Sequence, residues 1–243
     1  MLLSARLLGS EAVELGEIHT ATLGGSCALA LSRGRFPKGY PHTDPNEDAC
    51  FAATDGNSWL LAVADGHNGF TAAEAAIGAI ESPGLLALAA TDPAGAAGQA
   101  MTLAHKAVVS ALVGTDSSSR TALTVLAMSP AGVATSQAGD TVGFVVGRAR
   151  ARMLTEPGPF LGRDLASDAL AAPDSHTLQP GEGVVLASDG LIDFLGRQPL
   201  RILAPLFDPD EPLASVESAV GAAFAGGAGD NVALVWQHGM PDR

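Results

Sequence analysis

Short runs of apolar residues, bounded by glycine, proline, aspartate or asparagine, recur along the chain and predict β-strands. In the first part of the sequence these expected strands cover residues 26–32, 49–53 and 59–64, and a loop rich in proline and glycine covers residues 33–45. The run 59–64 reads WLLAVA and is apolar throughout, which indicates a strand that is covered on both faces. We expect this strand to end at Asp65.

Two helices are predicted between these strands and the second half of the chain. Thr71 and Glu74 have the spacing of a capping box, and the helix that they open is expected to run to about Ile80. Asp92 offers an N-cap and is followed by Pro93, a residue favoured in the first helical turn. That second helix is expected to end near residue 114.

From residue 120 onward, apolar segments separated by turns predict an antiparallel meander with strands at 121–128, 133–139, 141–147 and 148–155. Residues 157–180 are expected to be irregular, followed by a strand at 184–188, a helix at 213–224 and a strand at 232–237. This order of elements indicates the α+β class, because strands and helices do not alternate. No repeat or linker divides the sequence, so we expect residues 1–243 to form a single domain.

Composition and charge narrow the possible functions. The chain has 243 residues, of which 47% are hydrophobic, and this is enough for one large core. Its 26 acidic and 13 basic side chains give a net charge of −13, so we expect neither nucleic acid nor a membrane surface as a partner. Cys27 and Cys50 lie in apolar segments without a CxxC spacing, which predicts buried free thiols. No secretory leader and no long apolar run is present, and we expect a cytoplasmic protein.

Several aspartates share one local pattern, since each lies where a predicted strand meets a turn. These residues are Asp48, Asp65, Asp140, Asp189 and Asp230. If the strand ends lie side by side, the carboxylates converge, and such like charges require a cation between them. Oxygen ligands suit Mg²⁺ and Mn²⁺, while the lack of a His/Cys cluster argues against zinc. Gly66 has no Cβ, so its carbonyl can approach a metal. Taken alone, however, Asp65-Gly66 is better explained as an ordinary turn than as a functional site.

Five short segments carry a resemblance to a known family. NEDA (46–49), VADGHNG (63–69), AGDT (138–141), ASDGLID (187–193) and GDNV (229–232) resemble, in this order, the signatures of the metal-dependent PP2C-type protein serine/threonine phosphatases. The resemblance implies a four-layer αββα sandwich, in which two antiparallel sheets are flanked by helices. It also implies two Mn²⁺ or Mg²⁺ ions and a possible weaker third. Asp65 would bridge both ions with help from the Gly66 carbonyl, Asp189 and Asp230 would hold the first, Glu47 and Asp48 the second, and Asp140 the third.

The resemblance further implies a reaction and a partner. A metal-activated water would attack phosphorus directly, and His67 would protonate the leaving serine or threonine oxygen. The alternative for His67 is a solvated histidine in a turn. The substrate would be a phosphorylated protein in a signalling system, opposite a serine/threonine kinase. Asp193 is left out of the site, because an acidic residue in a first helical turn needs no functional reason.

The sequence departs from the family pattern near the acidic pair. The family has a phosphate-binding arginine shortly before this pair, whereas this chain has His42 and Thr43 there. Arg33, Arg35 and Lys38 are candidate replacements, although each is more often a solvated surface charge. Residues 156–168 also lack the family's usual flap sequence. Two alternatives therefore stay open: a phosphatase-like binding or regulatory protein of low activity, and a phosphatase for small phosphorylated metabolites.

Overall fold

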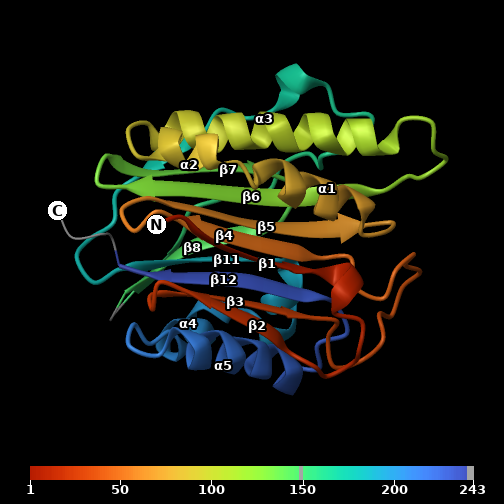
Figure 1. Ribbon diagram of the computed structural model, residues 1–243. Helices are drawn as coiled ribbons and strands as arrows, with labels where there is room; N and C mark the ends of the chain where they lie inside the picture. Colours follow the sequence, from red (N-terminus) through yellow and green to blue (C-terminus); the bar gives the residue numbers. More distant parts are fainter. Residues whose placement is uncertain (148–149, 240–243) are drawn as a thin grey trace.

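Two six-stranded antiparallel sheets lie face to face in the computed structural model, which describes residues 1–147 and 150–239 (Figure 1). The first sheet has the order β1 (Leu3–Leu8), β4 (Ala49–Thr54), β5 (Trp59–His67), β6 (Arg120–Ser129), β7 (Gly132–Ala138) and β10 (Asp174–His176). The second has the order β2 (His19–Leu23), β3 (Cys27–Ser32), β12 (Val232–His238), β11 (Gly183–Ala187), β8 (Val142–Gly147) and β9 (Arg150–Met153). The α+β sandwich expected from the resemblance is confirmed.

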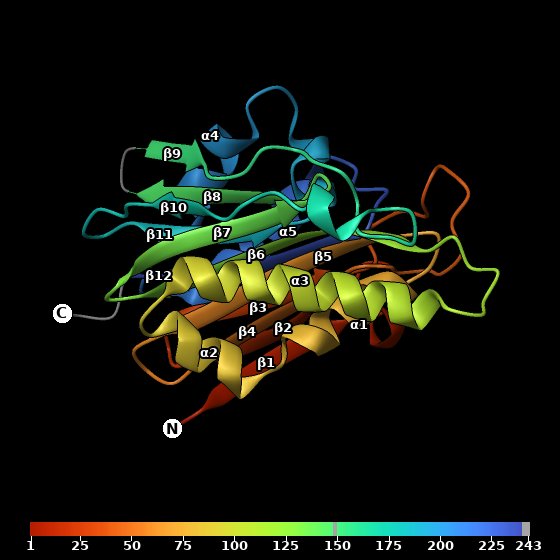
Figure 2. The same cartoon turned by 90° about the horizontal axis from the view of Figure 1, so that it is seen from above.

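Helices cover both outer faces of this pair of sheets (Figures 1 and 2). The first sheet carries α1 (Thr71–Ile80), α2 (Pro83–Ala89) and α3 (Pro93–Leu112), and the second carries α4 (Pro199–Leu203) and α5 (Pro212–Ala225). Short 3-10 turns lie at Gly9–Glu11, Ser167–Ala169, Asp189–Leu191, Asp193–Leu195 and Ala204–Leu206. Within the described residues no single helix is long and apolar enough to span a bilayer, although the bent pair α1 and α2 passes that test jointly.

The hydrophobic core has three layers, one between the sheets and one under each set of helices. Leu61 and Val63 of β5 face the layer between the sheets, whereas Leu60 and Ala62 face α1 and α3. This explains the unbroken apolar run, because neither face of β5 meets water. Cys27 and Cys50 are buried free thiols in the layer between the sheets, as predicted.

The end of β5 differs from the expectation. The strand does not end at Asp65 but continues through Gly66 to His67, paired with Ala122, Thr121 and Arg120 of β6. The turn comes at Asn68 and Gly69, whose φ angles of 62° and 109° lie in the left-handed region that these residues tolerate. The interpretation of Asp65-Gly66 as a turn is therefore wrong.

Several other boundaries need correction. The capping box at Thr71 does not form, because Phe70 is the N-cap residue and Glu74 instead accepts a hydrogen bond from the backbone of Ser10 at 3.1 Å. The N-cap at Asp92 is confirmed, since its side chain accepts from Gly95 N at 2.9 Å. The elements β1, β2, α2 and α4 were not predicted, and β10 lies within the segment expected to be irregular. Residues 148–149 of an expected strand lie outside the described residues.

Candidate functional site

The strand registers bring the predicted acidic residues to one end of the sandwich. Ala49 pairs with Ala64, so Asp48 and Asp65 are neighbours at the ends of β4 and β5. In the other sheet, Ala187 of β11 pairs with both Val142 and Leu234, so the acids that flank these strands lie at the corresponding end. This is the right-hand end in Figure 1, where β5 stops and the loop 33–45 projects, whereas both chain termini lie on the left.

Five of these residues form what we call the acidic cluster: Glu47, Asp48, Asp65, Asp189 and Asp230. Asp48 and Asp65 are only 1% and 6% exposed. Burial raises the pKa of Asp48 to about 8 and that of Asp189 to about 6, and neighbouring carboxylates add to both shifts. Burial, together with the charges of Asp48 and Asp189, also holds the pKa of Asp65 well above its usual range. Without a cation, Asp48 and Asp65 therefore retain protons at neutral pH, whereas Asp189 is mostly ionised.

Backbone contacts fix Asp65 in this position. The hydroxyl of Thr121 on β6 donates a hydrogen bond to the Asp65 carbonyl at 2.8 Å. Gly66 passes so close to the next chain segment that a Cβ there would collide with the carbonyl oxygen of Glu47. A glycine is therefore required at this position by close approach and not by a turn.

Glu47 and Asp230 are held by two residues of the loop 33–45. The Lys38 ammonium lies 3.1 Å from Glu47 Oε2 and 3.4 Å from Asp230 Oδ1, and its side chain is only 4% exposed. Burial alone would lower the pKa of Lys38, but the charges of Asp48, Asp230 and Glu47 outweigh it and raise the pKa. The Tyr40 hydroxyl lies 2.9 and 2.8 Å from the two carboxylate oxygens of Asp230. Tyr40 is a site residue that the sequence did not indicate.

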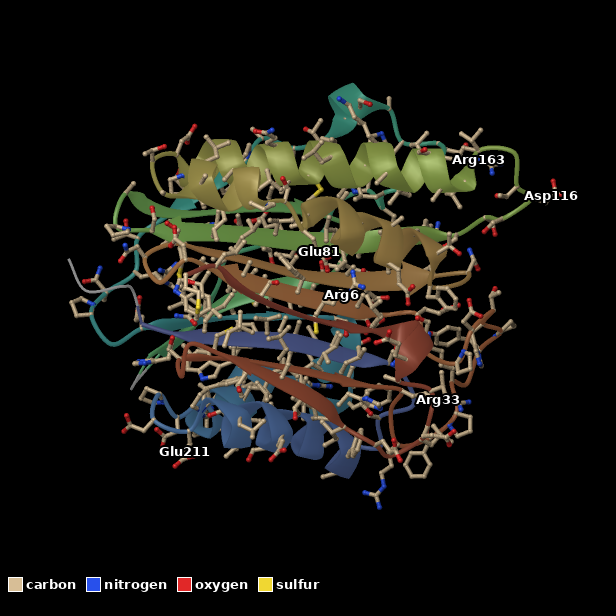
Figure 3. The ribbon with its side chains drawn as sticks, in the orientation of Figure 1. Arg6, Arg33, Glu81, Asp116, Arg163 and Glu211 are labelled. Carbon is tan, nitrogen blue, oxygen red and sulfur yellow. The ribbon has the colours of Figure 1, made fainter. Side chains whose placement is uncertain are left out.

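The other two predicted cations lie elsewhere. The guanidinium of Arg33 donates to the Val13 carbonyl at 2.8 Å, and Figure 3 shows this side chain beside the second sheet. Arg35 donates to the Phe224 carbonyl at 3.4 Å. In this structure Lys38 alone of the three candidates contacts the acidic cluster.

His67 lies beside Asp65 at the end of β5. Its Nδ1 is 3.5 Å from Asp65 Oδ1 and is buried without a hydrogen-bond partner among the described residues. Burial lowers the pKa of His67, Asp140 opposes this shift, and Arg120 adds to it. The ring also meets Phe160 edge to face, with centroids 4.8 Å apart.

Asp140 and Asp193 lie within the electrostatic reach of this cluster. Asp140 Oδ1 is buried and finds no hydrogen-bond partner in the described part of the chain. Burial raises the pKa of Asp193, and the charges of Asp230 and Asp140 raise it further. Asp193 is therefore a candidate site residue. The sequence analysis left it out, because an acidic residue at a helical start is common and the sequence does not show that Asp230 and Asp140 lie nearby.

The donor set fits a hard divalent cation. Carboxylate and carbonyl oxygens predominate, and Asp48 Oδ2 is buried with no partner among residues 1–147 and 150–239, which is the environment that a bound cation would satisfy. In those same residues, no three histidine, cysteine or acidic side chains already form a complete ligand set. Lys38 and Tyr40 contact Glu47 and Asp230, while Asp65 and Asp189 share a hydrogen bond. A cation would replace these contacts and the protons on the aspartates.

Comparison with known proteins identifies the fold. No protein-family model matches the sequence, and no curated protein matches it at a significant level. Among solved structures, the PPM serine/threonine phosphatase MsPP of Mycobacterium smegmatis, in complex with cacodylate, aligns with a TM-score of 0.67 and 23% identity over 87% of this chain and 97% of MsPP. The catalytic domain of the serine/threonine phosphatase PstP, in complex with two manganese ions, aligns with a TM-score of 0.70 and 19% identity over 91% and 97%. PppA of Pseudomonas aeruginosa, a key regulatory component of the type VI secretion system (T6SS), aligns with a TM-score of 0.65 and 20% identity over 93% of this chain and 99% of PppA.

Proposed function

Because the chain has the fold of the PPM-type, or PP2C-type, serine/threonine phosphatases, we propose that it is a metal-dependent phosphatase acting on phosphoserine and phosphothreonine in proteins. The observation that carries this proposal is the convergence of Asp48, Asp65 and Asp189 at adjoining strand ends. Asp48 and Asp65 are buried and Asp189 is partly buried, and the charges of Asp48 and Asp189 raise the cost of ionising neighbouring aspartates, so a divalent cation would stabilise the ionised cluster. A solvated acidic surface would show no such burial.

We assign the cluster to two Mn²⁺ or Mg²⁺ ions. When bound, such ions acidify a water molecule and stabilise the departing oxygen, so that no covalent intermediate on a side chain is needed. Asp65, with the Gly66 carbonyl, would supply ligands to both ions, Asp189 and Asp230 would hold the first, and Glu47 and Asp48 would hold the second. Asp140 would contribute to a weaker third site. The two manganese ions of PstP, a protein of the same fold, support this assignment.

Lys38 takes the place of the missing phosphate-binding arginine in this proposal. Its ammonium is already buried among the carboxylates, within 3.4 Å of Asp230, and its charge is maintained by them. A phosphate monoester that binds at the cluster therefore meets a fixed positive charge. Lysine provides a point charge and not the planar fork of arginine, so orientation of the phosphate must come from other contacts.

His67 is assigned to the leaving-group side of the reaction. It flanks the acidic cluster at the end of β5, and its ring is held between Asp65 and Phe160. An imidazole in this position can deliver a proton to the serine or threonine oxygen as the bond to phosphorus breaks. Within the proposal, the substrate is a phosphorylated protein and the opposing enzyme is a serine/threonine kinase.

The assay that tests the function is hydrolysis of a phosphothreonine peptide with and without Mn²⁺. We expect activity only with the metal, and we expect Asp65→Asn and Asp189→Asn to lose it together with saturable Mn²⁺ binding in calorimetry. Asp116→Asn is the matched control, because Asp116 lies in the exposed loop after α3 and outside the cluster (Figure 3). No saturable binding of Mn²⁺ at millimolar concentration would refute the proposal.

The same assay separates the role of His67 from metal binding. His67→Ala should retain Mn²⁺ affinity but lose far more activity on the phosphothreonine peptide than on an aryl phosphate, whose good leaving group needs little protonation. Equal losses on the two substrates would remove the leaving-group assignment.

A second candidate function is a phosphatase-like binding or regulatory protein. Two observations favour it: the usual arginine is absent, and Lys38 and Tyr40 already contact two predicted metal ligands. Metal binding without turnover of any phosphorylated substrate would select this alternative. Turnover of sugar phosphates or nucleotides in preference to phosphopeptides would instead indicate a phosphatase for small metabolites.

A further inference from the structure

Arg120 is an exposed cation at the rim of the site, and the proposed reaction does not use it. It is the residue of β6 that pairs with His67 of β5, so the two side chains start from adjacent positions in the sheet. Its guanidinium lies over the ring of Phe160, 4.8 Å from the centroid. No hydrogen bond or ion pair within the described residues occupies its donors, so the planar fork is free to bind a ligand.

Phe160 is a fixed platform between Arg120 and His67. The segment that carries it pairs with the start of β6, because Thr121 and Leu161 exchange two backbone hydrogen bonds of 2.9 and 2.8 Å. Two residues further on, Arg163 donates to the carbonyls of Leu112 at 2.7 Å and Thr115 at 2.9 Å, which attaches the segment to the end of α3 (Figure 3). One ring therefore contacts both the imidazole and the guanidinium.

The position of Arg120 relative to His67 suggests which part of a substrate it meets. On the proposed function, on which this inference rests, His67 faces the leaving oxygen, and the peptide chain is attached to that oxygen. Arg120 contacts the same Phe160 ring that packs against the imidazole, whereas Asp65 of the acidic cluster lies 3.5 Å from the imidazole Nδ1. A guanidinium that is stacked on an aromatic ring presents two parallel donors, which match a carboxylate or a phosphoryl group.

We propose that Arg120 and Phe160 form an anion-binding subsite for a carboxylate or a second phosphoryl group next to the phosphorylated serine or threonine of the substrate. The net charge of the protein bears on how acidic peptides bind at this subsite. With a net charge of −13, the protein repels acidic peptides at long range, so a local bidentate contact is needed to accept them. Arg120 thereby makes the site selective for phosphopeptides that are acidic around the phosphorylated residue.

The test measures binding of three non-hydrolysable peptides in the presence of Mn²⁺. Each carries a difluoromethylene phosphonate in place of the scissile phosphate, and the flanking residue is aspartate, phosphothreonine or alanine. In the parent protein we expect Kd for the two anionic peptides to be roughly fivefold to tenfold lower than for the alanine peptide. Arg120→Gln should remove this preference, and Arg120→Lys should retain part of it. Arg201→Gln on α4 removes one exposed charge away from this end of the molecule and should keep the preference intact.

Two results would overturn the subsite: equal Kd values for all three peptides in the parent, or an equal loss of affinity for all three in Arg120→Gln. The second result would mean that Arg120 only supports Phe160 and His67. A preference confined to one anionic peptide would support the subsite and identify its ligand as carboxylate or phosphoryl. If the corresponding phosphothreonine peptides are not hydrolysed while the binding preference persists, the proposed function fails and the subsite stands.

Discussion

Lys38 brings a buried positive charge into a group of acidic residues that is itself suited to cations. It contacts Glu47 and Asp230, which the proposed function gives to two different metal ions. The ammonium and a divalent cation therefore repel each other, whereas a phosphate would be attracted to both. At the scale of single residues, Lys38 is expected to weaken metal binding in the free enzyme and to strengthen it once phosphate is bound.

We expect Lys38→Met to bind Mn²⁺ more tightly in the absence of phosphate and to raise KM for a phosphothreonine peptide by about tenfold, because one charge-assisted contact is lost. Calorimetry and steady-state kinetics measure the two effects separately. Arg33→Met is the matched control from the same loop, since its guanidinium contacts Val13 and not the cluster. A Lys38→Met protein that behaves like Arg33→Met in both measurements would show that Lys38 has neither role.

At the scale of elements, the site depends on how closely β5 passes beneath the segment that contains Glu47. Gly66 has no room for a Cβ because of the Glu47 carbonyl oxygen, and the same stretch of β5 carries Asp65 and His67. A displacement of this strand therefore moves a predicted metal ligand and the predicted acid together.

Gly66→Ala is expected to reduce the free energy of unfolding by roughly 1–3 kcal/mol and to weaken Mn²⁺ binding, because backbone must shift to admit the methyl group. Gly78→Ala provides a control of opposite sign. Gly78 is exposed on α1 with nothing within 4 Å of a Cβ, so alanine there should stabilise by up to about 1 kcal/mol. Urea denaturation of both variants checks the pair, and unchanged stability and Mn²⁺ affinity in Gly66→Ala would contradict the close approach.

At the scale of the whole molecule, the acidic cluster sets how stability depends on pH. Asp48 has a pKa of about 8 in the folded, metal-free protein but about 3.9 when unfolded. Its proton therefore stabilises the fold fully below pH of about 4, and this contribution is lost progressively as the pH rises to about 8. Burial lowers the pKa of His105 and His176, so these histidines reduce the stability of the fold as the pH falls below their usual pKa.

The metal-free parent is thus expected to lose more stability between pH 6 and pH 8 than Asp48→Asn does, by on the order of 2 kcal/mol. Comparing the two proteins removes the contribution of the histidines, which both share. Denaturation in a chelator at the two pH values gives this difference, and added Mn²⁺ should restore the parent at pH 8. The same pH dependence in both proteins would mean that Asp48 ionises normally.

The residue types of the site are visible in the sequence, but their neighbours are not. Asp48, Asp65 and Asp189 stand out because each follows or precedes an apolar run. Asp193 and Tyr40 give no such signal. Their proximity to Asp230 depends on loops that return from distant parts of the chain.

The core strands and long helices are predictable because their apolar residues form a clear pattern, whereas the edge elements lack such a pattern. β5 and β6 are covered on both faces, so their apolar runs are unbroken and unambiguous. β1 and β2 are edge strands whose residues are mostly partly buried or exposed, and α4 is a short helix, so their apolar and polar positions form no clear local pattern. The failed capping box has a tertiary cause as well, since Glu74 bonds to the backbone of Ser10 instead of its own helix.

The sequence by itself therefore determined the class of fold, the acidic strand ends and the order of the signature segments, because burial and turn chemistry act on neighbours along the chain. Only the tertiary structure decided which charges meet. It placed Lys38 among the carboxylates, turned Arg33 and Arg35 away from them, and set Arg120 beside His67. Electrostatic interactions act through space over a few ångströms, so their outcome depends on packing that no local pattern records.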